Sequence, residues 1–195
     1  MNIICHRINT IDLLDQTPIH LGVEIDIRSN SKDLILHHDP FSNGELFVEW
    51  LEYYQHGTLI LNVKEEGLEH KILNLMKKYN ISDYFFLDQS FPFLLKTSNE
   101  GESKCAVRVS EHEDINTALS LEGMIKWVWV DCFTSFPLNL EDAKKLKASG
   151  FKLCFVSPEL QGYTNRSYVE NFRDSIELLG IKGDAVCTKY PDLWA

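Results

Sequence analysis

The stretch Gly22-Val23-Glu24-Ile25-Asp26-Ile27-Arg28 decides the fold, because it has the alternation of a strand and similar runs recur along the chain. Its apolar side chains occupy one face and its charged side chains the other, since side chains alternate along a strand. Other runs of this length occur at residues 2–6, 58–64, 84–88, 105–110, 127–131, 152–157 and 184–188. Several are almost continuously apolar, which is expected of parallel strands covered on both faces.

Helical patterns lie between many of these strands. The clearest helices are predicted at residues 68–79, 140–149 and 168–179, and Gly150 and Gly180 stop the last two. Residues 8–21 leave room for about two turns of helix, and the polar segment Thr97–Lys104 is predicted to be a loop. This alternation of strands and helices indicates a parallel α/β architecture.

One run breaks the alternation. Leu34–His38 follows the quoted stretch after only the residues 29–33, too few for a parallel crossover, so the two runs should form a hairpin. Eight strands remain, the number in a (β/α)8 barrel, although 195 residues are fewer than the usual size of about 250. We predict α/β class and an abbreviated (β/α)8 TIM barrel with a β-hairpin extension after strand 2, forming a single domain over residues 1–195.

Charge and composition limit the partners. The net charge of -10 argues against nucleic acid or an anionic membrane, whereas a small anionic substrate could still bind through a few focused cations. The five cysteines are widely spaced within apolar runs, which is typical of buried free thiols in a reducing compartment. No signal peptide and no apolar segment of about 20 residues is evident. We expect a cytoplasmic protein without a membrane segment; its oligomeric state stays open.

Polar residues concentrate where the predicted strands end. Catalytic groups of such barrels lie at the carboxyl ends of the strands. The residues there are His6, Arg7, Glu24, Asp26, Arg28, Asn62, Lys64, Arg108, Ser110, Trp129, Asp131, Ser157, Glu159, Thr188 and Tyr190. So many polar positions at one end predict a functional site there.

Glu24 and Asp26 are the sharpest pair in this set. Two carboxylates on one face of an apolar strand repel each other and lose hydration unless a cation lies between them. Oxygen ligands of this kind favour Mg²⁺ or Ca²⁺ over zinc. The alternative is an edge strand on which both side chains face solvent.

Two histidines and three basic residues fit around such a cation. His6 and His38 titrate near neutral pH and could act as general acid and general base, although a histidine taken alone is more often structural. Arg7, Lys64 and Arg108 would supply the positive field that a phosphate group requires.

These residues match a family signature. His6-Arg7, Glu24-Ile25-Asp26 and His38-Asp39-Pro40 resemble the HR…ExD…HD motif of the glycerophosphodiester phosphodiesterases, which are (β/α)8 barrels of the phosphatidylinositol-phospholipase-C-like superfamily. Residues 185–191 resemble the family's closing strand. The resemblance implies that His6 and His38 are the catalytic pair and that Glu24 and Asp26 bind the metal. It also implies that Arg7 binds phosphate and that Asp39 supports the site.

The sequence departs from the family pattern at several points. Asn62 stands where the family commonly has a metal-binding glutamate, so an uncharged amide oxygen would take that place. Asp131 is our candidate for a completing ligand, with helix capping as the equal alternative. Ile8 replaces a common glycine and Lys189 a common aspartate. These features resemble a compact bacterial branch of the family, whose general role is in lipid metabolism and whose members often accompany surface-polysaccharide genes.

The expected function is therefore a metal-dependent phosphodiester hydrolase that acts on a glycerophosphodiester or a sugar or polyol phosphodiester. One divalent cation, Mg²⁺ or Ca²⁺, and a small phosphodiester are the expected ligands. Two alternatives stay open: a barrel that binds phosphate esters without turnover, and a lyase that forms a cyclic phosphate. Trp127 and Trp129 could be core residues or a sugar platform, and Ser157 and Glu159 could bind substrate hydroxyls or cap a helix.

Overall fold

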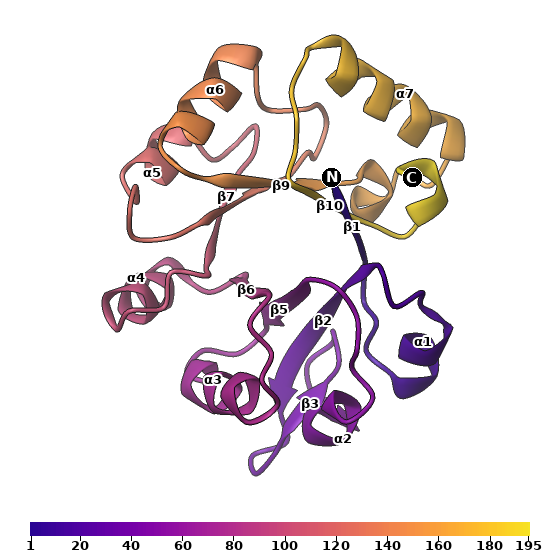
Figure 1. The fold of residues 1–195 in the computed structure, drawn as a ribbon, viewed down its shortest axis with the longest axis vertical. Helices are drawn as coiled ribbons and strands as arrows, with labels where there is room; N and C mark the ends of the chain where they lie inside the picture. Colours follow the sequence, from indigo (N-terminus) through magenta and orange to yellow (C-terminus); the bar gives the residue numbers. More distant parts are fainter. The chain divides into compact units, whose positions relative to one another are not determined.

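The computed structural model describes all 195 residues and divides them into two compact units. One unit comprises residues 4–101, and the other comprises residues 1–3 together with residues 102–195. Each unit is an α/β layer in which helices cover a parallel sheet (Figure 1). The predicted single domain over residues 1–195 stays a prediction.

The parallel strands of the unit 4–101 are the last two residues of β1 (Asn2–Cys5) together with β2 (Gly22–Ser29), β5 (Leu59–Val63) and β6 (Tyr84–Leu87). Strand β2 pairs with β1 through Gly22 and Val23, and with β5 along most of its length. This register places Asp26 opposite Asn62. All residues of β5 and β6 are buried, as continuous apolar runs predict.

The predicted hairpin after the second strand is confirmed. Strand β3 (Leu34–Leu36) pairs antiparallel with the end of β2, with Leu36 opposite Ile27. A further short strand that the sequence did not predict, β4 (Glu45–Leu46), pairs antiparallel with β3. Because β3 runs back along β2, the residues that follow it return to the middle of β2, and His37 N donates to the carbonyl of Asp26.

Helices α1 (Ile11–Gln16), α2 (Phe47–Leu51), α3 (Glu69–Lys78) and α4 (Phe91–Asn99) complete this unit. The predicted helix at 68–79 is α3, and the expected short helix after the first strand is α1, capped by Thr10. Helix α4 was missed, and the loop predicted at Thr97–Lys104 is wrong for residues 97–99. Leu94 and Thr97 are buried one turn apart, and this packing keeps the polar end of the segment helical.

The second unit contains the other four parallel strands in the order β7 (Ala106–Val109), β8 (Trp127–Val130), β9 (Lys152–Val156) and β10 (Ala185–Thr188). Helices α5 (Ile115–Leu119), α6 (Leu140–Ala148) and α7 (Arg166–Leu178) lie along one side of these strands (Figure 1). Two 3-10 turns, η1 (Pro158–Gln161) and η2 (Pro191–Leu193), follow β9 and β10. All eight predicted barrel strands are therefore present.

Several composition-based predictions hold in the structure. All five cysteines are buried and none forms a disulfide. Trp127 and Trp129 are only 6% and 5% exposed, which supports the core interpretation over a sugar platform. None of the helices combines the length and the apolar character that crossing a membrane would require.

We predict that Phe85→Ala lowers the free energy of unfolding by about 3–5 kcal/mol. Phe85 lies in β6 with none of its surface exposed, so the truncation leaves a cavity. Phe41→Ala is the matched control, because Phe41 is fully exposed and packs on nothing. Urea unfolding of both variants measures the difference, and equal losses would show that β6 is not part of the core.

Candidate functional site

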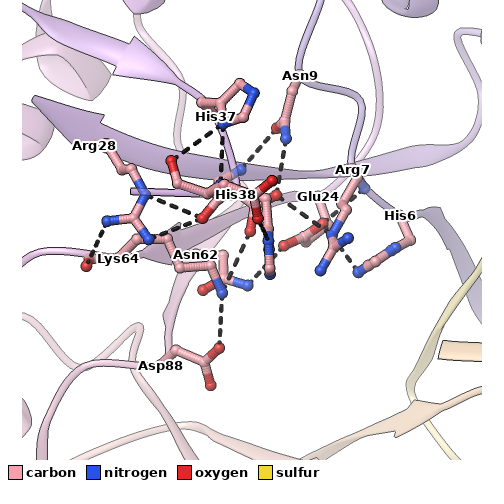
Figure 2. Close-up of polar contacts among 12 residues, drawn as sticks. His6, Arg7, Asn9, Glu24, Arg28, His37, His38, Asn62, Lys64 and Asp88 are labelled. Atoms are coloured by element: carbon pink, nitrogen blue, oxygen red, sulfur yellow. Dashed lines mark hydrogen bonds and ion pairs between the residues drawn. The ribbon is translucent and has the colours of Figure 1, made fainter. Parts of the chain in front are cut away.

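The carboxyl ends of β1, β2, β5 and β6 bring most of the predicted site residues together in the unit 4–101 (Figure 2). Each strand contributes one or two polar side chains at its end, and the hairpin adds one more pair. The set consists of His6, Arg7, Glu24, Asp26, Arg28, His38, Asp39, Asn62 and Lys64, to which the structure adds Asn9 and Asp88. Adjacent parallel strands end at one edge of the sheet, which explains this convergence.

Glu24 and Asp26 are completely buried. Strand β2 lies between β5 on one side and β1 and β3 on the other, so it is not an edge strand. The alternative in which both carboxylates face solvent is therefore excluded. The two charges must be balanced by groups in their immediate surroundings.

Neutral donors hold both oxygens of Glu24. The amide nitrogen of Arg7 lies 2.7 Å from Oε2, and Asn62 Nδ2 lies 2.8 Å from Oε1. His6 Nε2 is 3.8 Å from Oε2. Arg7 adopts a left-handed backbone with φ 57°, unusual for a residue with a side chain, and its backbone N–H donates to the buried carboxylate from this conformation.

Burial and, to a smaller extent, the neighbouring charge of Asp26 together raise the pKa of Glu24 to about 7. The hydrogen bonds from Asn62 and Arg7 oppose this shift without cancelling it. Glu24 therefore changes its protonation state near neutral pH, unlike an ordinary surface glutamate.

Asp26 is balanced by cations and by an amide. Asn9 Nδ2 donates to Oδ2 of Asp26 at 2.8 Å, and the backbone N–H of Asp26 donates to Oδ1 of Asn9 at 2.8 Å. Lys64 Nζ lies 3.3 Å from Oδ1 and Arg7 Nε lies 3.7 Å from Oδ2. Sequence reasoning missed Asn9, because nothing in its local pattern reveals that the loop after β1 folds over β2.

Lys64 bridges Asp26 and Asp88. Its Nζ lies 3.2 Å from Asp88 Oδ2, at the end of β6. Asp88 also has a left-handed backbone, with φ 58°. The sequence signal for Asp88 was its position directly after a buried strand. Its contact with Lys64 could not be predicted, because that contact depends on the pairing of β5 with β6.

His38 and Asp39 form a second hydrogen-bonded pair of the candidate site, directly after the hairpin strand β3. His38 Nδ1 is 2.8 Å from Asp39 Oδ1, and because a carboxylate can only accept, the imidazole carries its proton on Nδ1. This hydrogen bond lowers the pKa of Asp39 below its ordinary value. His37 instead accepts from the Asp39 N–H at 3.0 Å, a contact that shapes the turn.

A cavity of about 630 Å³ opens beside these groups, large enough for a small phosphodiester. Its lining includes Arg7, Asn9, His38, Asp39 and Glu45. The cavity thus places an arginine and a histidine in reach of one bound molecule.

The donor set is compatible with a hard divalent cation. Asp26 Oδ1 and Asn62 Oδ1 are buried and accept no hydrogen bond, although Lys64 lies close to the first. Such oxygens are suitable ligands for Mg²⁺ or Ca²⁺. No group of three or more His, Cys, Asp or Glu side chains is arranged to hold a metal. A cation here would have two carboxylates and the Asn62 amide oxygen as protein ligands. The ammonium group of Lys64 would compete with it for Asp26.

Arg108 and Asp131 lie in the other unit. Their side chains contact each other, with Arg108 Nε 3.5 Å from Asp131 Oδ2. Asp131 Oδ1 accepts from Gln161 and from the backbone N–H of Cys132. Their roles as phosphate and metal ligands stay predictions.

Ser157 and Glu159 are both buried, and the Ser157 side chain makes no capping hydrogen bond to η1 although it stands at the N-cap position. Glu159 is 2% exposed and accepts hydrogen bonds from Ser157, Thr188 and the Lys189 backbone N–H. Trp194 donates to Ser157. This buried network ties η1 and the end of β10 together, so both interpretations made from the sequence are replaced by a structural role.

Comparison with known proteins shows the fold. A glycerophosphodiester phosphodiesterase from Agrobacterium tumefaciens superposes on this chain with a TM-score of 0.67 at 13% sequence identity. The match covers 100% of this chain and 98% of the phosphodiesterase. A glycerophosphoryl diester phosphodiesterase from Parabacteroides distasonis superposes with a TM-score of 0.66 at 12% sequence identity, and the match covers 98% of this chain and 84% of that protein. A mutant tryptophan synthase α-subunit from Pyrococcus furiosus superposes with a TM-score of 0.56 at 12% sequence identity, and the match covers 98% of this chain and 89% of that subunit.

The chain has the fold of the glycerophosphodiester phosphodiesterases. This confirms the predicted α/β class and abbreviated (β/α)8 architecture. It also agrees with the resemblance that the motifs carry. No protein-family model and no curated protein matches the sequence, so the likeness rests on the fold.

We predict that Glu24→Gln flattens the pH dependence of stability. The pKa of this carboxyl is about 7 in the folded chain against an ordinary value of 4.5. Glu24 therefore stabilises the fold below about pH 4.5, and this contribution is lost as pH rises through 7, a change on the order of 3 kcal/mol. Urea unfolding of both proteins between pH 5 and 8, with chelator present, measures the difference in slope. Parallel curves would contradict the shift.

Proposed function

We propose that the protein is a metal-dependent phosphodiester hydrolase acting on a glycerophosphodiester or a sugar or polyol phosphodiester. The observation that carries this proposal is the buried Glu24–Asp26 pair, which lies beside an imidazole and two cationic side chains at the ends of parallel strands. The fold shared with glycerophosphodiester phosphodiesterases supports it.

Arg7 and Lys64 would bind the phosphate group. Both cationic side chains lie within 4 Å of Asp26, yet the side chain of Arg7 is 41% exposed and lines the cavity. A phosphodiester carries one negative charge that a guanidinium can meet with two hydrogen bonds.

His38 and His6 would move the protons of the reaction. With its proton on Nδ1 and bound to Asp39, neutral His38 keeps its Nε2 lone pair for a proton of the attacking water or substrate hydroxyl. His6, next to Glu24, would then protonate the leaving alcohol, and the reverse assignment uses the same two groups. Asp39 orients the imidazole and stabilises its charged form, as the acid partner of a catalytic histidine does.

Glu24, Asp26 and Asn62 would hold one divalent cation, Mg²⁺ or Ca²⁺. When bound, the cation would polarise a phosphoryl oxygen. Because Asn62 contributes no charge, we expect weaker cation binding than a third carboxylate would give.

The uncharged Asn62 also favours a second candidate, a barrel that binds phosphate esters without turnover. Its Nδ2 donates to Glu24, so one potential ligand is already hydrogen-bonded within the chain. Tight binding of a phosphate ester without product under any metal would support this candidate.

The buried free thiols support a reducing compartment such as the cytoplasm, and the two bacterial neighbours are consistent with a compact bacterial branch.

We predict that His38→Ala and His6→Ala each lower kcat by about 10²- to 10⁴-fold, because each removes one proton-transfer group. Glycerophosphodiesters and bis-aryl phosphate are suitable substrates, assayed with Mg²⁺, Ca²⁺ or chelator. His70→Ala is the control, since His70 is exposed on α3 and pairs only with Glu100 among the acidic residues. Phosphorus NMR distinguishes hydrolysis from a cyclic product. Activity that is unchanged both by chelator and by the His6→Ala substitution would refute the mechanism.

We predict that Asn62→Asp tightens divalent-cation binding on the order of tenfold by adding a carboxylate. Without metal, the same substitution should lower the melting temperature, because it replaces the Asn62–Glu24 hydrogen bond with repulsion between buried charges. Calorimetric titration with Ca²⁺ and Mg²⁺, and melting with and without metal, test both effects. Unchanged affinity would remove Asn62 from the ligand set.

A further inference from the structure

We propose that Arg28 is a positioning residue that holds the main chains carrying His38 and Lys64 at a fixed spacing. This inference rests on the proposed function, because it concerns a proton-transfer group and a phosphate-binding group. No motif singles out Arg28. It follows Asp26 by two residues on β2 and shares the face of Glu24 and Asp26.

The guanidinium contacts two carbonyl groups at once (Figure 2). Nε and Nη2 both donate to the carbonyl oxygen of His38, at 3.0 and 2.8 Å. Nη1 lies 3.4 Å from the carbonyl oxygen of Lys64 and 3.6 Å from Glu65 Oε1. A single planar group thus joins the end of the hairpin to the end of β5.

The surroundings of Arg28 hold it in this position. Its side chain is only 14% exposed. Glu65 is itself anchored, since its Oε2 accepts from the backbone N–H and the hydroxyl of Ser29 at 3.1 and 2.7 Å. The guanidinium is therefore confined from two sides, and its donors point at main-chain oxygens instead of at the cavity.

His38 depends on this contact more than a residue within a strand would. It lies two positions beyond the end of β3, and the side chain of Asp39, its hydrogen-bond partner, is 69% exposed. The carbonyl of His38 accepts two hydrogen bonds from Arg28, which keep the backbone of His38 at the strand ends. Charge-assisted bonds to a rigid planar group hold a carbonyl more firmly than a flexible ammonium could.

Kinetics on Arg28→Gln and Arg28→Lys test the proposal with bis-aryl phosphate as substrate. We expect Arg28→Gln to lower kcat by about 10²-fold with a smaller change in KM, because misplacing a proton-transfer group by about 1 Å has this effect. Arg28→Lys should have a kcat between those of Arg28→Gln and the native protein, since one ammonium group cannot replace the three hydrogen bonds of the guanidinium to the two carbonyl oxygens. Arg173→Lys is the matched control: Arg173, in the other unit, donates to the carbonyl of Leu193 and pairs with Asp174.

A double-mutant cycle separates positioning from general destabilisation. If Arg28 acts through His38, Arg28→Gln should cost much less activity in the His38→Ala background than in the native one. A loss of the same factor in both backgrounds would overturn the proposal.

Amide hydrogen exchange tests the contact without any need for turnover. In Arg28→Gln, the amides of residues 37–44 should exchange at least about tenfold faster, while those of β5 and β6 keep their native rates. Unchanged exchange at residues 37–44, or faster exchange throughout the unit, would overturn the positioning role. If the native protein turns over no phosphodiester, the proposed function fails, and the exchange experiment still decides whether Arg28 holds His38.

Discussion

The burial of Glu24 and Asp26 side by side on β2 is the constraint that the rest of the site has to satisfy. Two carboxylates removed from water repel each other and lose their hydration, so every oxygen needs a donor or a cation close by. Asn9, Asn62 and the Arg7 backbone supply neutral donors, and Lys64 and Arg7 supply positive charge. The raised pKa of Glu24 shows that this compensation is incomplete.

The unusual backbone conformations of the site follow from that constraint. Arg7 and Asp88 both have positive φ values although neither is glycine; Arg7 lies two residues after the end of β1, and Asp88 directly follows β6. The Arg7 conformation goes with a backbone N–H that reaches Glu24, and Asp88 lies within reach of Lys64. Each conformation costs about 1–3 kcal/mol, which contacts with buried charges can offset. Local strain is therefore part of how the strand ends hold their functional groups.

Much of the fold was predictable because it depends on local patterns. Runs of strand length, either almost continuously apolar or alternating, identified all eight parallel strands, and the short connection at residues 29–33 identified the hairpin. Helix α4 and strand β4 escaped prediction, because their stability comes from burial against residues distant in sequence. The same limit applies to Ser157 and Glu159, which looked like rim residues but are enclosed by Thr188 and Trp194 from the end of the chain.

The sequence by itself determined which residues stand at the ends of the strands, because strand periodicity fixes the face on which each side chain lies. It thereby identified His6, Glu24, Asp26, His38 and Lys64 as one candidate site. Only the tertiary structure decided how their charges are balanced. The β2–β5 register puts Asn62 opposite Asp26, from where its amide donates to Glu24. The loop after β1 brings Asn9 onto Asp26, and the hairpin brings the His38 carbonyl within hydrogen-bonding distance of Arg28. Such pairings join segments far apart in the chain, so no local pattern contains them.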